Sequence, residues 1–135
     1  MTPPHGFAPH YRTSPLTDPW EPLFSRRVGD TVQIGVRLAP AHANSRGMAH
    51  GGLISALADN AMGLSCGLGM DAAGGLVTVN LALDFLAPAR IGQWLQVDPV
   101  VVKRGRGLCF ASALVTADGK PCARGSATFQ VVSRG

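Results

Sequence analysis

Apolar and polar residues alternate over two stretches of the chain, and this alternation is typical of half-buried β-strands. The first stretch covers residues 31–38 and the second covers residues 77–85. Three further strands are predicted at residues 94–103, 108–116 and 122–132. Pro99 predicts a bulge or an edge position in the first of these three, and Asp118-Gly119 predicts a tight hairpin between the last two.

Between the first two strands the apolar spacing becomes helical, which predicts a helix over residues 52–68. One stripe of this helix is apolar and consists of Leu53, Leu57, Leu64 and Leu68. A second stripe, spaced four residues apart, consists of Ser55, Asp59, Gly63 and Gly67. Gly in a helix interior costs about 1 kcal/mol relative to Ala, so this stripe indicates close approach of another backbone. A short helix capped by Ser14 or Thr17 is also expected before the first strand.

One long helix followed by four strands in hairpin succession predicts an α+β fold, in which an antiparallel sheet packs on one main helix. At 135 residues the chain is expected to form a single domain. Residues 1–14 contain Pro and His where a signal peptide needs apolar residues, and they are interpreted as a flexible N-terminal arm. The domain itself is expected over residues 15–135.

Composition and charge narrow the possible functions. The formal net charge of +4 is too small, and the aromatic content of 6% too low, to indicate nucleic-acid binding. This charge would suit an anionic small ligand, although an ordinary basic surface explains it equally well. No apolar run is long enough to span a membrane without Gly or charge, and the His residues show no metal-ligand spacing. The three cysteines, Cys66, Cys109 and Cys122, are interpreted as buried residues of a protein in the reducing cytoplasm.

Asp59 is the only charged residue between Arg46 and Asp71, and it lies within the apolar helix. Burying a carboxylate is costly unless partners are supplied. A solvent-facing or locally bonded Asp is one interpretation, but the small residues of its stripe favour a crevice. Asp59 is therefore a candidate catalytic residue.

His50, Gly51 and Gly52 stand where the loop becomes helix. The first turn of a helix has free N–H groups and a partial positive charge, and Gly lets a ligand approach that backbone closely. Such an end can bind an anion, or polarise a carbonyl and hold the oxyanion that forms from it. A simple turn, with His50 bonded to backbone, is the other interpretation.

The spacing of these candidates bears on the oligomeric state. Gly51 and Asp59 are eight residues apart, which corresponds to about 12 Å along one helix axis. A general base and an oxyanion donor must both reach one reacting group at about 3 Å. One helix cannot supply both to the same carbonyl, whereas two antiparallel copies can. If both groups are catalytic, the protein is at least a homodimer with shared active sites.

The stretch NSRGMAHGGLISALADNAMG at residues 44–63, followed by LVTVNLALDFLAPARIGQ at 76–93, resembles the PaaI-like (phenylacetic-acid-type) branch of the hotdog-fold acyl-CoA thioesterases. The resemblance covers about residues 14–132. It implies a hotdog fold, with a curved antiparallel sheet of five or six strands wrapped around one long central helix. It also implies hydrolysis of acyl-CoA thioesters with aryl, short or medium acyl groups, no separate cofactor, and homodimers that pair into homotetramers.

The resemblance also implies roles for individual residues. Asn44 and the N–H of Gly51 would polarise the thioester carbonyl, and His50 would support their loop. Asp59 from the partner chain would activate a water or attack directly. Thr78 matches a position that helps to place the water, although a surface threonine explains it equally well.

A basic turn completes the predicted site. Lys103, Arg104 and Arg106 resemble the turn near which coenzyme A phosphates bind in the family, with a solvated turn as the alternative. A hotdog hydratase or dehydratase is disfavoured because no His-Phe-type loop is present. A non-catalytic acyl-CoA-binding protein is disfavoured by the retained acid, and a serine hydrolase by the absence of G-x-S-x-G.

Overall fold

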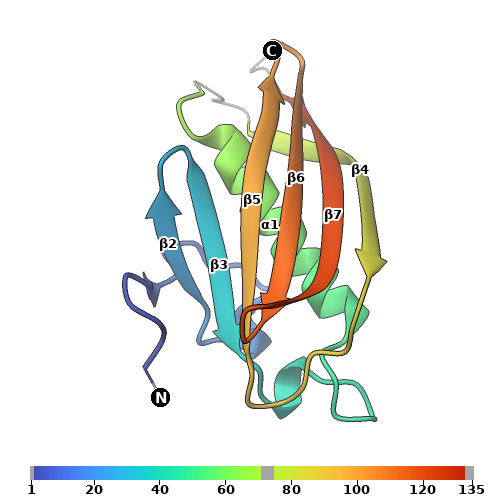
Figure 1. The fold of residues 1–135 in the computed structure, drawn as a ribbon. Coiled ribbons are helices and arrows are strands. Elements are labelled where there is room, and N and C mark those ends of the chain that lie inside the picture. The colour runs from blue at the N-terminus through green and yellow to red at the C-terminus, as the bar shows by residue number, and fades with distance from the viewer. Residues whose placement is uncertain (1, 71–74, 133–135) are drawn as a thin grey trace.

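The computed structural model describes residues 2–70 and 75–132. The described residues form one antiparallel sheet of seven strands with one long helix on it (Figure 1). Across the sheet the strands follow the order β1-β2-β3-β5-β6-β7-β4. The strands are β1 (Ala8–Pro9), β2 (Phe24–Val28), β3 (Thr31–Arg37), β4 (Leu76–Phe85), β5 (Trp94–Arg104), β6 (Leu108–Ala117) and β7 (Lys120–Val131). The helices are α1 (Gly51–Gly67) and two short 3-10 helices, η1 (Asp18–Trp20) and η2 (Pro40–His42).

This architecture confirms the predicted α+β hotdog fold. Figure 1 shows α1 running diagonally across one face of the sheet, and it contacts strands β3 to β7. The five predicted strands are all present, but β1 and β2 were missed and the sheet exceeds the expected five or six strands. Two arginines interrupt the alternation of β2, and β1 is only two residues long. Thr17 precedes η1, as expected of a cap, but its side chain makes no capping hydrogen bond there.

The buried face of α1 repeats in adjacent pairs every four residues. It consists of Leu53, Ile54, Leu57, Ala58, Ala61, Met62, Ser65 and Cys66. The predicted apolar stripe is therefore only partly buried, because Leu64 and Leu68 lie at the margin of this face. Ser65 also bonds to the sheet on this face, because its hydroxyl accepts the N–H of Val32 on β3 at 2.9 Å. Cys66, Cys109 and Cys122 are buried and free, as predicted.

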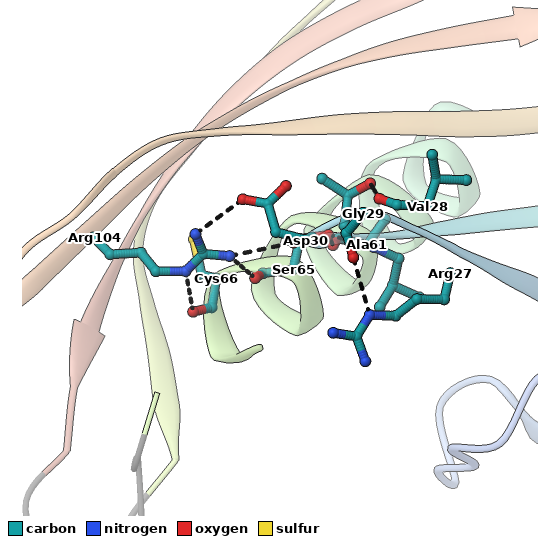
Figure 2. A network of polar contacts seen from close by, with 10 residues as sticks. Arg27, Val28, Gly29, Asp30, Ala61, Ser65, Cys66 and Arg104 are labelled. Carbon is teal, nitrogen blue, oxygen red and sulfur yellow. Dashed lines mark hydrogen bonds and ion pairs between the residues drawn. The ribbon is translucent and has the colours of Figure 1, made fainter. Parts of the chain in front are cut away.

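The C-terminal end of α1 is held by Arg104 (Figure 2). Its guanidinium donates to the carbonyl oxygens of Ser65 at 2.8 Å and Cys66 at 3.3 Å, and its Nη1 pairs with the Asp30 carboxylate at 3.1 Å. Cations at this end also complement the helix dipole. The arginine therefore joins β5, the β2–β3 turn and α1.

The residues interpreted from the sequence as a flexible arm lie packed on the domain. β1 pairs with β2, and the N–H of His10 donates to the carbonyl oxygen of Leu23 at 2.9 Å. Phe7 is buried edge-on against Trp94, with ring centroids 5.1 Å apart, and Arg26 stacks over Phe7. Buried aromatic area of this kind anchors the arm, and it was not foreseen because a single Phe sets no pattern.

Strand β4 occupies one edge of the sheet and contains a bulge at Val79. Thr78 pairs with Phe129 and Leu81 pairs with Ala127, and both partners are core residues. Directly paired residues point to the same face, so Thr78 and Leu81 both face α1 although they are three residues apart. The prediction of unbroken alternation through this strand is therefore wrong, because one extra residue reverses the faces.

Two turn and edge predictions are confirmed. The register between β3 and β5 runs only from Arg37 opposite Trp94 to Ile34 opposite Val97, so Pro99 lies beyond it, where β5 pairs with β6 alone. Asp118 and Gly119 adopt φ of 48° and 83°, which is the left-handed geometry of a tight hairpin turn. None of the helices in the described part of the chain is long and apolar enough to cross a membrane.

The packing of Trp94 on β3 yields a prediction about stability. A Cβ added at Gly35 would lie 2.8 Å from Cε2 and 2.9 Å from Cη2 of Trp94. Gly35→Ala should therefore lower the free energy of unfolding by about 1–3 kcal/mol, as overpacking does, measured by urea denaturation. Gly107→Ala is the matched control, because a Cβ there meets nothing within 4 Å. Equal stability of the two variants would contradict the assigned Trp94 packing.

Candidate active site

Asp59 and Thr78 form a hydrogen-bonded pair between α1 and β4. The hydroxyl of Thr78 donates to Oδ1 of Asp59 at 2.6 Å. Asp59 lies on the half-buried stripe of the helix that faces away from the core, and the bulge at Val79 points Thr78 towards it. Bulges often re-aim side chains beside active sites. The pair leaves the second carboxylate oxygen of Asp59 available for another partner.

The Asp59–Thr78 pair opens into a cavity of about 460 Å³. This acid cavity extends along α1 towards its C-terminal end, past Gly63 and Gly67. Its apolar wall consists of Leu64, Leu68, Leu76 and Phe129. A volume of this size is typical of small-molecule sites. The two glycines of the predicted stripe, Gly63 and Gly67, thus line the cavity, which accounts for their small size.

His50 caps the N-terminus of α1. Its Nδ1 accepts a hydrogen bond from the N–H of Gly52 at 2.8 Å, and its own N–H donates to the carbonyl oxygen of His42 at 3.0 Å. The N–H of Gly51, the first residue of the helix, has no acceptor among the described residues. The helix N-terminus therefore presents a free donor at the position where the sequence predicts one.

The side-chain oxygen of Asn44 is hydrogen-bonded within its own loop. Oδ1 accepts from the N–H of Arg46 at 2.9 Å and from that of Met48 at 3.2 Å. These bonds close the turn that leads to His50. The amide nitrogen of Asn44, which has no partner among the described residues, is the only part of the side chain that could donate to a ligand.

The structure does not bring the two candidate groups together within one chain. Asp59 and Thr78 line the acid cavity, whereas His50 and Gly52 line a separate cavity of about 410 Å³, together with Trp20 and Leu53. A Cβ at Gly51 would meet the ring of Phe85 at 3.2 Å, at the far end of β4 from Thr78. Within one chain the two candidate groups therefore lie apart, as the rise of the helix requires.

The predicted basic turn divides into two parts. Arg104 is engaged by the C-terminal carbonyls of α1 and by Asp30, so its guanidinium has a structural role and is not a free phosphate ligand. Lys103 and Arg106 are exposed, and neither forms an ion pair within the described part of the chain. These two residues keep the charge that the resemblance assigns to coenzyme binding.

Sequence reasoning missed one wall of the acid cavity. The wall is formed by the N-terminal arm, through His10, Tyr11, Arg12, Thr13 and Ser14. No periodicity or motif in these residues marks them as functional. Their position depends on Phe7 and β1, neither of which has a recognisable sequence signal.

Comparison with known proteins identifies the family of the chain. The sequence model of the thioesterase superfamily matches residues 46–123. A Pseudomonas aeruginosa protein named "Putative esterase PA0474" is 38% identical over 97% of this chain and 98% of its own length. The human protein named acyl-coenzyme A thioesterase 13 is 32% identical over 69% of this chain and 67% of its own.

The fold itself recurs among solved structures. A variant of the phenylacetic acid degradation protein PaaI from Thermus thermophilus superimposes with a TM-score of 0.77, at 22% identity, over 88% of this chain and all of that chain. This similarity confirms the PaaI-like hotdog architecture that the sequence predicts. The match of the superfamily model over more than half of the chain establishes the family: the protein belongs to the thioesterase superfamily.

Proposed function

We propose that the protein hydrolyses acyl-CoA thioesters at sites that two chains share, with Asp59 from one chain and the Gly51 end of α1 from the other. The observation that carries this proposal is the Thr78–Asp59 pair at the mouth of a cavity. The unbonded N–H of Gly51 in the same chain lies about 12 Å from Asp59 along α1. The human relative named as an acyl-CoA thioesterase supports this class of substrate.

The chemistry follows from the hydrogen bond. Thr78 donates to one oxygen of Asp59 and so orients the carboxylate, leaving the other oxygen to accept a proton from water. That water attacks the thioester carbonyl, and the N–H of Gly51 in the partner chain stabilises the developing oxyanion. Collapse of the tetrahedral intermediate breaks the C–S bond and releases the thiolate. Direct attack by Asp59 would instead form an anhydride, which water then hydrolyses.

The edge strand β4 supplies the surface for the second chain. Among the described residues it pairs only with β7, so its outer edge has backbone groups without strand partners there. Val77, Val79 and Phe85 are each more than half exposed, an apolar edge that a monomer would leave prone to association. Pairing of β4 with β4 of a second copy would continue the sheet and cover these residues.

Symmetry then fixes how the helices meet. In an isologous dimer, Gly51 opposite Asp59 implies that Asp59 also lies opposite Gly51. The midpoint of this arrangement is Ser55, a small residue whose hydroxyl bonds the carbonyl oxygen of Gly51 at 2.8 Å. Two antiparallel helices can therefore approach closely at their common axis. Tetramers would form by pairing of two such dimers.

The bound substrate would contact both chains. The acyl group would occupy the acid cavity, which runs towards the C-terminal end of its own α1. Because the helices are antiparallel, the basic turn of the partner chain would lie on the opposite side of the thioester. Lys103 and Arg106 of that turn would meet the anionic nucleotide of coenzyme A. We expect aryl and short or medium acyl groups to fit this cavity of about 460 Å³.

Asp59→Asn should lower kcat for acyl-CoA hydrolysis by about 10²–10⁴-fold, because it keeps the shape of the side chain but removes the base. Thr78→Val, which keeps the shape but removes the hydroxyl, should lower kcat by about 10–100-fold, the cost of a hydrogen bond to a charged group. Initial-rate kinetics on hexanoyl-CoA measure both. Asp84→Asn is the control, an identical change at an exposed acid of β4 that pairs with Arg124. Asp59→Asn turnover within tenfold of wild type would rule out a catalytic Asp59.

The double variant Lys103→Gln with Arg106→Gln should raise KM for an acyl-CoA by about threefold to tenfold, and should leave KM for the corresponding acyl-pantetheine unchanged. The truncated substrate lacks the phosphates that these charges would contact. Arg104→Gln should instead lower the melting temperature, because it removes the bonds at the end of α1. Equal KM changes for both substrates would assign Lys103 and Arg106 to the solvated surface.

A further inference from the structure

The outer face of the sheet, which is turned away from α1, has an apolar patch over β5 and β6. In Figure 1 α1 lies behind β5, β6 and β7, and no other described helix or strand crosses the side of these strands that faces the viewer. Four large apolar side chains on this outer face are between 37% and 59% exposed. They define the outer patch: Val100, Leu108, Phe110 and Leu114.

The outer patch is contiguous. Val100 pairs with Ser112, which lies between Phe110 and Leu114 on the same face of the sheet. An antiparallel sheet with one solvated face normally has polar residues on that face. Single exposed apolar side chains are common, but a contiguous apolar patch indicates an interaction surface.

Opposite charges lie at the two ends of the patch. Asp98 pairs with Leu114 and Lys103 pairs with Phe110, so both belong to the outer face of β5. They are five residues apart, which is about 17 Å along a strand. Nε2 of Gln96 donates to Oδ1 of Asp98 at 2.8 Å and so orients the carboxylate. A surface with an acid at one end and a base at the other is complementary to a second copy of itself turned through 180°.

We propose that the outer patch joins two β4-paired dimers into a tetramer, in which each patch faces the patch of a chain in the other dimer. The proposal rests on the β4-paired dimer of the proposed function, whose two-fold axis would pass through the middle of β4. The register connects that point with the patch, because Leu81 pairs with Ala127 and Ala127 pairs with Ala111. Ala111 lies between Phe110 and Ser112, at the centre of the patch on β6.

Symmetry then fixes how the two sheets meet. The tetramer would have three two-fold axes that are mutually perpendicular and meet at one point. One of them would run between the two sheets, along the row of paired residues from Leu81 to Ala111. It would set β6 antiparallel over β6 of the facing chain. Phe110 would then lie over Ser112 of the facing chain, a large side chain over a small one.

The same axis brings together the ends of the patch. Leu108 would lie over Leu114 of the facing chain, and Asp98 would lie over Lys103 of that chain. Each contact occurs twice between two facing patches, because the arrangement is isologous. The Lys103 ammonium has three donor hydrogens, so contact with a carboxylate leaves donors for a coenzyme A phosphate.

Sedimentation velocity tests the proposal, and the wild-type protein should be a tetramer. Val100→Glu and Phe110→Glu should each give dimers, because both place two unpaired acids close to the axis between the sheets. Ile91→Glu is the matched control, at an apolar residue that is 46% exposed in the turn between β4 and β5. It should remain tetrameric. Both patch variants should keep kcat for hexanoyl-CoA within about twofold, because the proposed active sites lie between the chains of one β4-paired dimer.

A charge exchange tests the antiparallel arrangement of the facing strands. Asp98→Lys should raise the dissociation constant of the tetramer into dimers by about tenfold or more, because it would bring two cations together. Adding Lys103→Asp to this variant should restore tight pairing, since each lysine at position 98 would again face an acid. A double variant that dissociates as readily as Asp98→Lys would overturn this arrangement.

The outcomes separate the tetramer from the proposed function. A tetramer that survives in Val100→Glu and Phe110→Glu, or a wild-type dimer whose mass Val100→Glu does not change, would overturn the role of the patch and leave the shared active sites intact. A wild-type monomer, or a wild-type dimer that Val100→Glu converts to monomers, would overturn both. If Phe110→Glu does not fold, the more exposed Val100 decides. Tetramers that divide as expected but hydrolyse no thioester would overturn the proposed function alone.

Discussion

The fixed rise of an α-helix is the constraint on which the account of this protein depends. α1 contains both chemical elements of the proposed site, an N–H at Gly51 with no acceptor among the described residues and a carboxylate at Asp59. About 12 Å of rigid helix keeps them apart: Asp59 lines the acid cavity, and Gly51 does not line it. The small residues between and beyond them, Ser55, Gly63 and Gly67, are explained by the same constraint. Ser55 would leave room for the helix of a second chain, and Gly63 and Gly67 would leave room for a ligand in the acid cavity.

The surrounding sheet determines which groups reach the acid. A single inserted residue at Val79 turns Thr78 towards α1, where it holds Asp59 by a hydrogen bond of 2.6 Å. Without this bulge, side chains would alternate strictly along β4, and Thr78 would point away from the helix. Arg104 has a complementary role at the C-terminal end of α1, because it ties the carbonyls of Ser65 and Cys66 to β5 and to Asp30. The position of the acid thus depends on a contact at the middle of the helix and on contacts at its C-terminal end.

Much of this arrangement could be predicted from local patterns. The alternation of residues 31–38, the helical spacing after Gly51 and the Asp118-Gly119 turn each depend on short-range physics, and the structure confirms them. The bulge could not be foreseen, because Val79 fits a perfect alternation and only the pairing with β7 reveals the extra residue. Arg104 was grouped with its basic neighbours because sequence shows charge but not partners. The wall that residues 10–14 form was missed, because their position comes from the long-range contact of Phe7 with Trp94.

The central claim is that each active site draws on two chains, and a mixing experiment measures it most directly. Asp59→Asn and Gly51→Val homodimers should each be nearly inactive, the second because a larger side chain crowds the donor and meets Phe85. After verified subunit exchange, about half of the dimers should be mixed, and each mixed dimer should contain one site with an intact Gly51 end and an intact Asp59. The account predicts recovery of about a quarter of wild-type thioesterase activity. No recovery after exchange would contradict it.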